Sequence, residues 1–380
     1  MRIALTIHAL HGGGAERQLA ELADFLVAHG HEVTVITWDH THTDQYRVDS
    51  RVQRIGLGLM SDSRNLWQAL LANRRRVQAL SQQLRNYRPD VVISFTDKMN
   101  IVTLACRPTS PVIIAERSDP RKQKLSRLWE TWRNRTYPRA AAMIALTQPI
   151  AAALKARFPN SQVVVIPNAV AIASSSTTTE KPHTAEMSNP STSNHLPKRR
   201  ALAVGRLSPE KGFDLLLKAW QQANPAAEAW ELVIVGDGPS REQLEKLRSE
   251  LGLQHEVHFA GWCQDVATQY RTADLYISSS HYEAMSRSLL EALSYQLPVI
   301  ATRATDGLEE IVQANVNGWL VPTADVVALA AAIRAATTPA TKLNAMGAKS
   351  ASLVKSHAWS NIGPKWLDLI EKVVCNQKAS

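Results

Sequence analysis

The sequence predicts an α/β protein made of two domains, each built on a parallel sheet, and three observations support this. Short apolar runs, beginning with Ile3–Ile7, alternate with amphipathic stretches of helical length, as in parallel sheets covered by helices. A Ser/Thr-rich segment, residues 171–198, interrupts the alternation and offers almost nothing to bury. A second α/β repeat then opens with the apolar run Arg200–Val204. We therefore expect domains at 1–170 and 199–358, joined by a mobile linker.

The cysteine content indicates a protein of a reducing compartment. The chain has 380 residues, of which 45% are hydrophobic, enough for two domains of ordinary size. Cys106, Cys263 and Cys375 are too widely spaced for a disulfide framework or a zinc site. No apolar run reaches the ~18 residues of a membrane span. We expect a cytoplasmic protein whose membrane contact, if any, is peripheral.

The positive charge is concentrated in the first half. Residues 1–168 hold 23 Lys and Arg against 13 Asp and Glu, whereas residues 169–380 hold 20 against 21. Such asymmetry predicts an anionic partner for the first domain, either lipid or nucleic acid. No nucleic-acid recognition motif is present, so lipid is favoured.

Two carboxylates, Glu283 and Glu291, bracket the start of a helix expected over 286–294, after a strand at Leu275–Ser278. The free N–H groups of Met285 and Ser286 would point between the carboxylates, where the helix dipole favours an anion. A ligand with polyols at both ends and phosphate between them would fit, which describes a nucleotide sugar. The spacing alone fits an ordinary solvated helix face equally well.

Two glycine-rich turns also follow strands. Gly205 ends the strand that opens the second domain, and Arg206 and Lys211 follow it five residues apart, where both cations could reach one diphosphate. In the first domain, Gly13 and Gly14 lie between a strand and a helix, where backbone N–H groups can approach a phosphate or sugar. A turn that only packs a helix on a strand is the alternative for both.

Residues 121–135 read as an amphipathic helix. Its apolar side carries two tryptophans, and its remaining positions are crowded with cations: Arg121, Lys122, Lys124, Arg127, Arg133 and Arg135. A solvated charged face is one interpretation. The other is a surface helix that meets anionic headgroups or a diphosphate-linked lipid, and the charge excess of this half favours it.

Four motifs in the second domain resemble, in order, those of the retaining glycosyltransferases of family 4. They are Gly205-Arg206-Leu207-x-x-Glu210-Lys211-Gly212, Gly236-Asp237-Gly238-Pro239, Val257-x-Phe259-x-Gly261 and Glu283-x7-Glu291. The resemblance implies the GT-B fold, in which two Rossmann-like domains face each other across a cleft. It also implies that the second domain holds the donor and that the first holds the acceptor.

The resemblance assigns roles to individual residues. Glu283 would hold sugar hydroxyls, with Arg206 and Lys211 as its catalytic partners, and Glu291 would hold the ribose. Gly13 and Gly14 would lie by the donor diphosphate, and the backbone near His258 and Phe259 would bind uracil. The expected substrate-binding set is completed by Glu116, Arg117, Gly205, Met285, Ser286 and Leu290, and the expected lipid or acceptor contacts are Arg121, Lys124 and Arg127.

The chain also departs from the family pattern. Many members place a histidine where this chain has Glu116-Arg117, and Gly-Phe-Gly where it has Ala284-Met285-Ser286. The run Glu116-Arg117-Ser118-Asp119-Pro120 is similar to that of a subgroup that extends polyprenyl-diphosphate-linked oligosaccharides. The segment Trp359–Val374 resembles the terminal helix that crosses back onto the first domain.

We therefore expect a retaining glycosyltransferase that moves a hexose or N-acetylhexosamine from a UDP-sugar to a polyprenyl-diphosphate-linked saccharide. It would serve bacterial cell-surface polysaccharide or glycan assembly at the inner face of the cell membrane. No Asp-x-Asp motif appears, so we expect no metal and no cofactor beyond the donor. A nucleotide-sugar epimerase on the same scaffold is the first alternative, and a nucleic-acid-binding protein is the second.

Overall fold

The structure is a computed structural model that describes residues 1–60, 66–172, 198–225 and 229–379. The chain forms two compact units. Unit 1 comprises Met1–Ala169 and Trp359–Ser380, and unit 2 comprises Val170–Ala358. The first stretch of unit 1 ends one residue before the expected boundary at 170, and unit 2 ends at residue 358; unit 2 begins at Val170, whereas the second domain was expected to begin at residue 199. Most of the expected linker, residues 173–197, lies outside the described residues.

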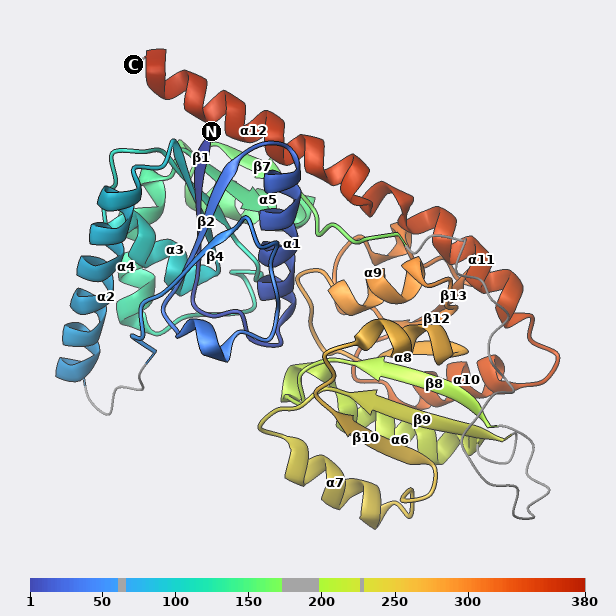
Figure 1. Cartoon of the computed structure of the whole chain (residues 1–380). Helices are drawn as coiled ribbons and strands as arrows, with labels where there is room; N and C mark the ends of the chain where they lie inside the picture. The colour runs from blue at the N-terminus through green and yellow to red at the C-terminus, as the bar shows by residue number, and fades with distance from the viewer. Residues whose placement is uncertain (61–65, 173–197, 226–228, 380) are drawn as a thin grey trace. The chain divides into compact units, whose positions relative to one another are not determined.

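Unit 1 contains a seven-stranded parallel sheet with the strand order β3-β2-β1-β4-β5-β6-β7 (Figure 1). The strands are β1 (Arg2–Ile7), β2 (Glu32–Thr37), β3 (Gln53–Gly56), β4 (Val91–Phe95), β5 (Val112–Ala115), β6 (Ala142–Ala145) and β7 (Val163–Val165). The helices are α1 (Gly14–Ala28), α2 (Leu66–Tyr87), α3 (Asp97–Ala105), α4 (Arg127–Thr136), α5 (Gln148–Arg157) and α12 (Trp359–Ala379).

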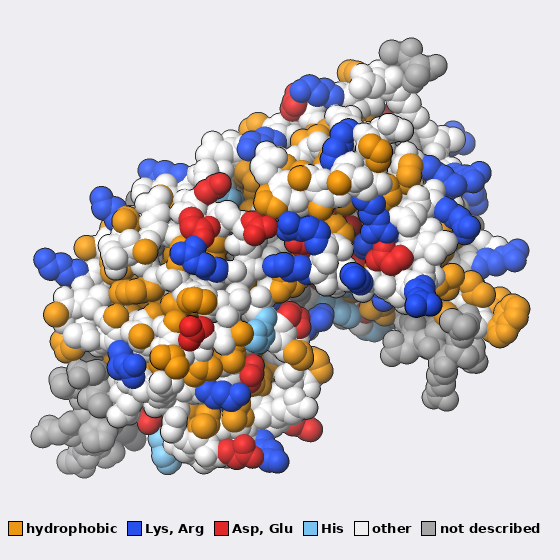
Figure 2. Space-filling view, turned by 180° about the vertical axis from the view of Figure 1, so that it is seen from behind, with side chains coloured by type: hydrophobic (Ala, Val, Ile, Leu, Met, Phe, Trp, Pro, Cys, Tyr) orange, Lys and Arg blue, Asp and Glu red, His pale blue; other side chains and the backbone are white. Residues whose placement is uncertain are grey.

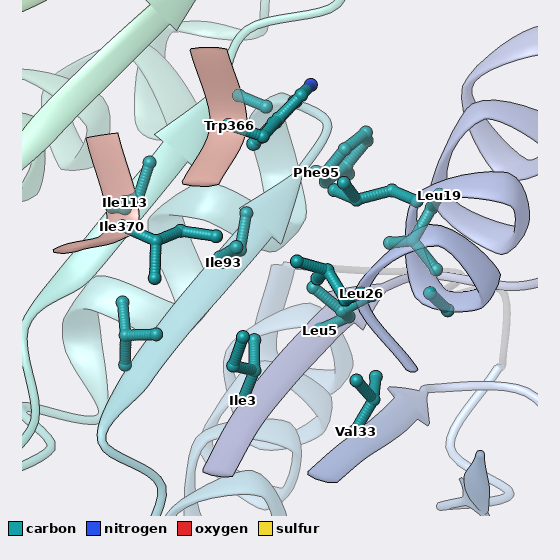
Figure 3. Close-up of a cluster of buried hydrophobic side chains, with 14 of the residues drawn as sticks. Ile3, Leu5, Leu19, Leu26, Val33, Ile93, Phe95, Ile113, Trp366 and Ile370 are labelled. Atoms are coloured by element: carbon teal, nitrogen blue, oxygen red, sulfur yellow. The ribbon is translucent and has the colours of Figure 1, made fainter. Parts of the chain in front are cut away.

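The core of unit 1 explains why the C-terminal helix belongs to it. Alternate residues of β1 and β4 face α1 and α12, and Figure 3 shows Ile93 and Phe95 beside Trp366 and Ile370. The rings of Phe95 and Trp366 stack with centroids 5.8 Å apart. The intervening residue Thr6 points the other way, and its hydroxyl meets that of Thr103 on α3 at 3.0 Å. Helices therefore cover both faces of this sheet.

Unit 2 repeats the same plan with a six-stranded parallel sheet in the order β10-β9-β8-β11-β12-β13. The strands are β8 (Arg199–Val204), β9 (Trp230–Val235), β10 (Val257–Gly261), β11 (Leu275–Ser278), β12 (Val299–Thr302) and β13 (Gly318–Val321). The helices are α6 (Phe213–Ala223), α7 (Arg241–Glu250), α8 (Val266–Thr272), α9 (Arg287–Ser294), α10 (Val326–Thr337) and α11 (Leu343–Leu353).

Side-chain alternation sorts these helices onto two faces. Ala201, Ala203 and their neighbours pack in one cluster with α6, α7 and α10. Leu202 packs in a second cluster with residues of α8 and α9. The strands are apolar on both faces, as parallel sheets require.

Both sheets have a point where the strand order reverses. In unit 1 it lies between β1 and β4, and in unit 2 it lies between β8 and β11. The loops that leave neighbouring strands diverge at such a point, and open α/β sheets bind ligands there, beyond the carboxyl ends of the strands. The fold therefore marks one candidate site in each unit before any side chain is considered.

The structure corrects one predicted element. The amphipathic helix expected over 121–135 begins only at Arg127, because Asp119 organises the preceding residues into a turn. The Asp119 carbonyl accepts hydrogen bonds from the N–H groups of Lys122 and Gln123, and the Asp119 carboxylate accepts one from the N–H of Arg121. Among the residues that the structure describes, no helix is long and apolar enough to cross a membrane.

Candidate active site

A lysine and a glutamate meet at the reversal point of unit 2. The loop after β8 carries Lys211, and the loop after β11 carries Glu283, whose Oε1 accepts a hydrogen bond from Lys211 Nζ at 2.5 Å. The Ser280 hydroxyl donates to the same oxygen at 2.9 Å. The side chains of Lys211 and Glu283 keep 21% and 15% of their surface exposed, so both can still meet a ligand.

Glycine is needed beside this pair. Gly212 has φ of 61°, and a Cβ there would overlap the carbonyl oxygen of Ser279. The Ser279 hydroxyl also donates to the carbonyl of Lys211 at 3.0 Å. The close approach of these two backbone segments therefore holds the loop of Lys211 against the loop that carries Glu283.

The second carboxylate is held from two sides. Glu291 is buried on α9, where Arg287 Nε donates to its Oε1 at 2.9 Å and the Tyr270 hydroxyl donates to its Oε2 at 3.1 Å. Burial raises the pKa of Tyr276, and Glu283 and Glu291 add to the shift, so its hydroxyl stays protonated. That hydroxyl donates to Ser288 Oγ at 2.8 Å, which ties the start of α9 to β11.

Two hollows open at this edge of the sheet. The smaller, of about 10 Å³, is lined by Lys211, Ser280, Glu283 and Ser288, and it has room for about one water molecule. The larger, of about 330 Å³, is lined in part by Phe213, which also lines the smaller one. Its volume falls in the range of small-molecule sites. The other residues around it are Ser208, Pro209, Asp214, Ser240, Gln243, Leu244, Leu247 and His281.

The structure places the remaining predicted residues of unit 2 at different depths. Gly205 and the exposed Arg206 lie in the loop of Lys211, and Met285 and Ser286 precede α9, with Ser286 as its N-cap. Leu290 is fully buried on α9 and packs in one core cluster with residues of α8. His258 and Phe259 lie within the edge strand β10, before its carboxyl end at Gly261. The lysine, the two glutamates and the start of α9 are thus brought to one edge.

In unit 1, Arg117 is the predicted residue with the clearest placement. Its guanidinium lies over the Phe95 ring, 5.0 Å from the centroid, and donates to Asn168 Oδ1. Gly13 is the N-cap of α1 and Gly14 is its first residue, both in the loop that leaves β1. These residues follow β1 and β5 at the carboxyl edge of the sheet.

Glu116 lies in a buried polar network. Only 1% of its surface is exposed, and its carboxylate accepts from the Tyr137 hydroxyl at 2.8 Å and from the Ser118 hydroxyl at 2.9 Å. Arg133 Nη2 lies 3.9 Å from Glu116 and 3.5 Å from Asp97. Burial raises the pKa of Glu116, although the Arg133 guanidinium opposes the shift. The carboxylate therefore joins the loop after β5 to α4 and to Tyr137, which directly follows α4.

The burial of Arg133 corrects its predicted place on a solvated cationic face. Its side chain is 1% exposed, whereas Lys124 and Arg127 are exposed as expected and Arg121 forms an ion pair with Asp119 at 2.6 Å. Figure 2 shows Lys and Arg side chains, in blue, over the surface of one face. The cationic surface next to α4 is therefore narrower than the sequence suggested.

Replacing Arg133 with Met should destabilise the protein by about 3 kcal/mol at neutral pH, because it leaves Glu116 buried without its cation. Loss of Arg133 removes the influence that lowers the pKa of Glu116, so this pKa rises further. A carboxyl whose pKa is raised in the folded state contributes most to folding stability when the pH is below its ordinary pKa of 4.5, and it contributes less as the pH rises. The destabilisation should therefore grow from pH 5 to pH 8 in urea unfolding.

The matched control is Arg135→Met, an exposed position on the same helix. It should change the unfolding free energy by less than about 0.5 kcal/mol at every pH. An equal effect of both variants, or a loss at Arg133 that shrinks as pH rises, would contradict the network described above.

Sequence reasoning missed four polar residues of the unit 2 site. Arg287 lies four positions before Glu291, and this i,i+4 spacing could have predicted their ion pair. Ser288 and Tyr270 gave no such signal, because their partners come from other elements of the sheet and its helices. Ser280 lies three residues before Glu283 in the same loop, a spacing that by itself predicts no contact.

Comparisons with known proteins identify the family of the chain. Residues 188–352 match the model of glycosyl transferases group 1, and residues 12–174 match the model of glycosyltransferase family 4. These matches identify a glycosyltransferase, and the similar solved structures show the GT-B fold. The chain belongs to glycosyltransferase family 4.

One curated relative and the similar solved structures cover nearly the whole chain. A Campylobacter jejuni protein is 26% identical over 98% of this chain and 99% of its own length; it is named GalNAc-alpha-(1->4)-GalNAc-alpha-(1->3)-diNAcBac-PP-undecaprenol alpha-1,4-N-acetyl-D-galactosaminyltransferase. The structure is similar to sucrose-phosphate synthase from Thermosynechococcus elongatus, with a TM-score of 0.82, 20% identity and 99% coverage of both chains. It is also similar to Anabaena HepE in complex with UDP and glucose, with a TM-score of 0.74, 20% identity, and 98% and 100% coverage.

Proposed function

We propose that this glycosyltransferase moves an N-acetylhexosamine or hexose from a UDP-sugar to a saccharide linked to a polyprenyl diphosphate. The observation that carries the donor half is the contact between Lys211 and Glu283 at the reversal point of unit 2, with Glu291 fixed about one turn into the next helix. A cation there faces a diphosphate, and the carboxylates on either side face hydroxyls. The complex of the similar HepE with UDP and glucose supports a UDP-linked donor.

Two observations support the acceptor half of the proposal. The relative named as acting on a polyprenol-diphosphate-linked glycan aligns over the whole chain. The excess of basic residues lies in the first half, and Lys124 and Arg127 are exposed beside α4. A peripheral position on the inner membrane face would bring such an acceptor to unit 1.

The proposed chemistry keeps the anomeric configuration. The attacking hydroxyl forms its bond on the face that the diphosphate leaves, and the leaving phosphate oxygen takes the hydroxyl proton. Lys211, Arg206 and the N–H groups before α9 stabilise the charge that develops on the diphosphate. These groups supply the electrostatic role without a metal ion, which is part of the proposal.

A panel of UDP- and GDP-sugars, incubated with the full chain and extracted lipid-linked acceptors in EDTA, tests this function. Mass spectrometry should show one sugar type added from a UDP donor, and NMR of the product should show an α-linkage from an α-linked donor. Transfer from GDP-sugars alone, or an inverted linkage, would contradict the proposal. Conversion of a UDP-sugar to its epimer without any acceptor would instead identify an epimerase.

The membrane contact gives a separate prediction. Replacing Lys124 and Arg127 together with Ala should weaken binding to vesicles containing anionic lipid by about 2 kcal/mol, since each exposed cation contributes about 1 kcal/mol near such a surface. Vesicle co-sedimentation at low and high salt measures this, and UDP affinity should not change. The matched control is Lys218→Ala with Lys246→Ala, two exposed lysines of unit 2. An equal loss in the control would mean that any surface lysine contributes.

A further inference from the structure

The reversal point of unit 1 carries two histidine–carboxylate pairs that the donor site does not use. His8, the first residue after β1, places its Nε2 3.1 Å from Oε1 of Glu16 on α1. His11, in the same loop, places its Nε2 2.8 Å from Oδ2 of Asp39, which follows β2. Two such pairs leave the carboxyl ends of adjacent strands, the edge where open α/β sheets bind ligands.

In each pair the carboxylate is buried and the imidazole is accessible. The side chains of Glu16 and Asp39 are 8% and 12% exposed, whereas those of His8 and His11 are 29% and 42% exposed. If each pair served only to hold the loop closed, its imidazole ring would not need to be accessible. The arrangement instead holds each ring by one nitrogen and presents the rest of it outward.

Hydrogen bonds from neighbouring residues hold the Asp39 carboxylate in place and favour its ionised form. Its Oδ1 accepts from the backbone N–H of His40 at 2.8 Å, and its Oδ2 accepts from the Thr43 hydroxyl at 3.0 Å. Burial opposes the ionisation of Asp39, but these hydrogen bonds and the one from His11 outweigh it and lower its pKa. The Asp39 N–H donates to the carbonyl of His8, which ties the β2 loop to the β1 loop.

An ionised Asp39 selects the tautomer of a neutral His11 ring. The carboxylate accepts from Nε2–H, so the proton stays on Nε2 and the lone pair on Nδ1 is available as a hydrogen-bond acceptor. No hydrogen bond to Nδ1 of His11 comes from the residues that the structure describes. The Glu16 carboxylate orients His8 in the same way.

Backbone strain marks the same point of the sheet. Thr96, directly after β4, has φ of 73°, a conformation that a β-branched residue rarely adopts. Its N–H donates to the carbonyl of Ala115 and its carbonyl accepts from the N–H of Asn100, so its surroundings hold it there. Strain of this kind gathers at functional sites.

We propose that the His11–Asp39 pair, with the His8–Glu16 pair beside it, binds the acceptor saccharide, and that Nδ1 of His11 accepts a hydrogen bond from the sugar hydroxyl that is to be glycosylated. The inference rests on the proposed function and adds the residues that recognise its acceptor. A hydrogen bond at this hydroxyl fixes the orientation of its oxygen. His11 is then a binding residue, and Asp39 positions it.

His11→Gln is the discriminating variant, because a glutamine amide can replace Nε2–H toward Asp39 but offers nothing at the place of Nδ1. Asp39→Asn places an amide N–H donor where the carboxylate accepted from Nε2–H of His11. The variant therefore favours the His11 tautomer in which Nδ1 carries the proton. Both variants should raise the acceptor KM at least tenfold. The donor KM, the UDP affinity measured by calorimetry and the melting temperature should stay near those of the wild type.

A matched control separates recognition from loop structure. His42→Gln replaces an exposed histidine of the loop that carries Asp39. It should keep the acceptor KM within about twofold. The inference is overturned if His11→Gln keeps the wild-type acceptor KM, or if donor and acceptor KM rise together as the melting temperature falls. A wild type that transfers nothing to any lipid-linked saccharide would refute the proposed function itself.

Discussion

Glu283→Gln should lower the rate of sugar transfer about 100-fold while changing UDP affinity by less than about threefold. The carboxylate accepts from both Lys211 and Ser280, which aim it at one point beyond β11. An amide of the same shape loses the charge and one acceptor, so in the proposed arrangement it would hold the sugar hydroxyls less well in the transition state. The nucleotide end of the donor would not sense this change.

Steady-state kinetics with the best donor of the panel and calorimetry with UDP measure the two quantities. Glu309→Gln is the matched control, because Glu309 is an exposed glutamate of unit 2 that forms an ion pair with Arg303. It should leave both quantities unchanged. Transfer by Glu283→Gln within about threefold of the wild type, a difference of well under 1 kcal/mol, would mean that this carboxylate does not hold the sugar.

Lys211→Met should lower kcat/KM about 100-fold, equivalent to about 2.7 kcal/mol, and should also weaken UDP binding about tenfold. The lysine supplies a positive charge at a site lined by Glu283 and Ser288, so a diphosphate loses its counter-charge when it is removed. Lys218→Met, on α6 and exposed, is the matched control and should have no effect.

The double variant Lys211→Met with Glu283→Gln separates a functional pair from a structural one. If the contact served only to hold two loops together, neutralising both partners would restore activity along with the melting temperature. We expect the melting temperature to recover and transfer to stay at or below the level of the single variants. Recovery of transfer would assign the pair to the fold.

Much of the fold could be predicted from the sequence because the strands are short, apolar and followed by turn residues. The strand at Leu275–Ser278 has the predicted bounds, and α9 begins one residue later than expected. The helix at 121–135 was predicted too long, because the apolar period could be read but not the turn in which Asp119 captures the preceding N–H groups. Local hydrogen bonds from an aspartate compete with a helix in this way.

The site could be predicted in its parts but not in its contacts. The spacing of Glu283 and Glu291 and the cation at Lys211 are visible in the chain. The contact between Lys211 and Glu283 is not visible in the chain. These residues are 72 positions apart, and they meet only because β8 and β11 are neighbouring strands. The burial of Arg133 was equally hidden, as its partners Asp97 and Glu116 follow two other strands.

UDP calorimetry on Glu291→Gln and Glu283→Gln, each checked for an unchanged melting temperature, tests most directly whether the two carboxylates hold opposite ends of one nucleotide sugar. We expect Glu291→Gln to weaken UDP binding about tenfold, since in the proposed arrangement Glu291 holds the ribose, and Glu283→Gln to leave it within about threefold. Equal weakening by both variants, or a loss confined to Glu283→Gln, would contradict this arrangement.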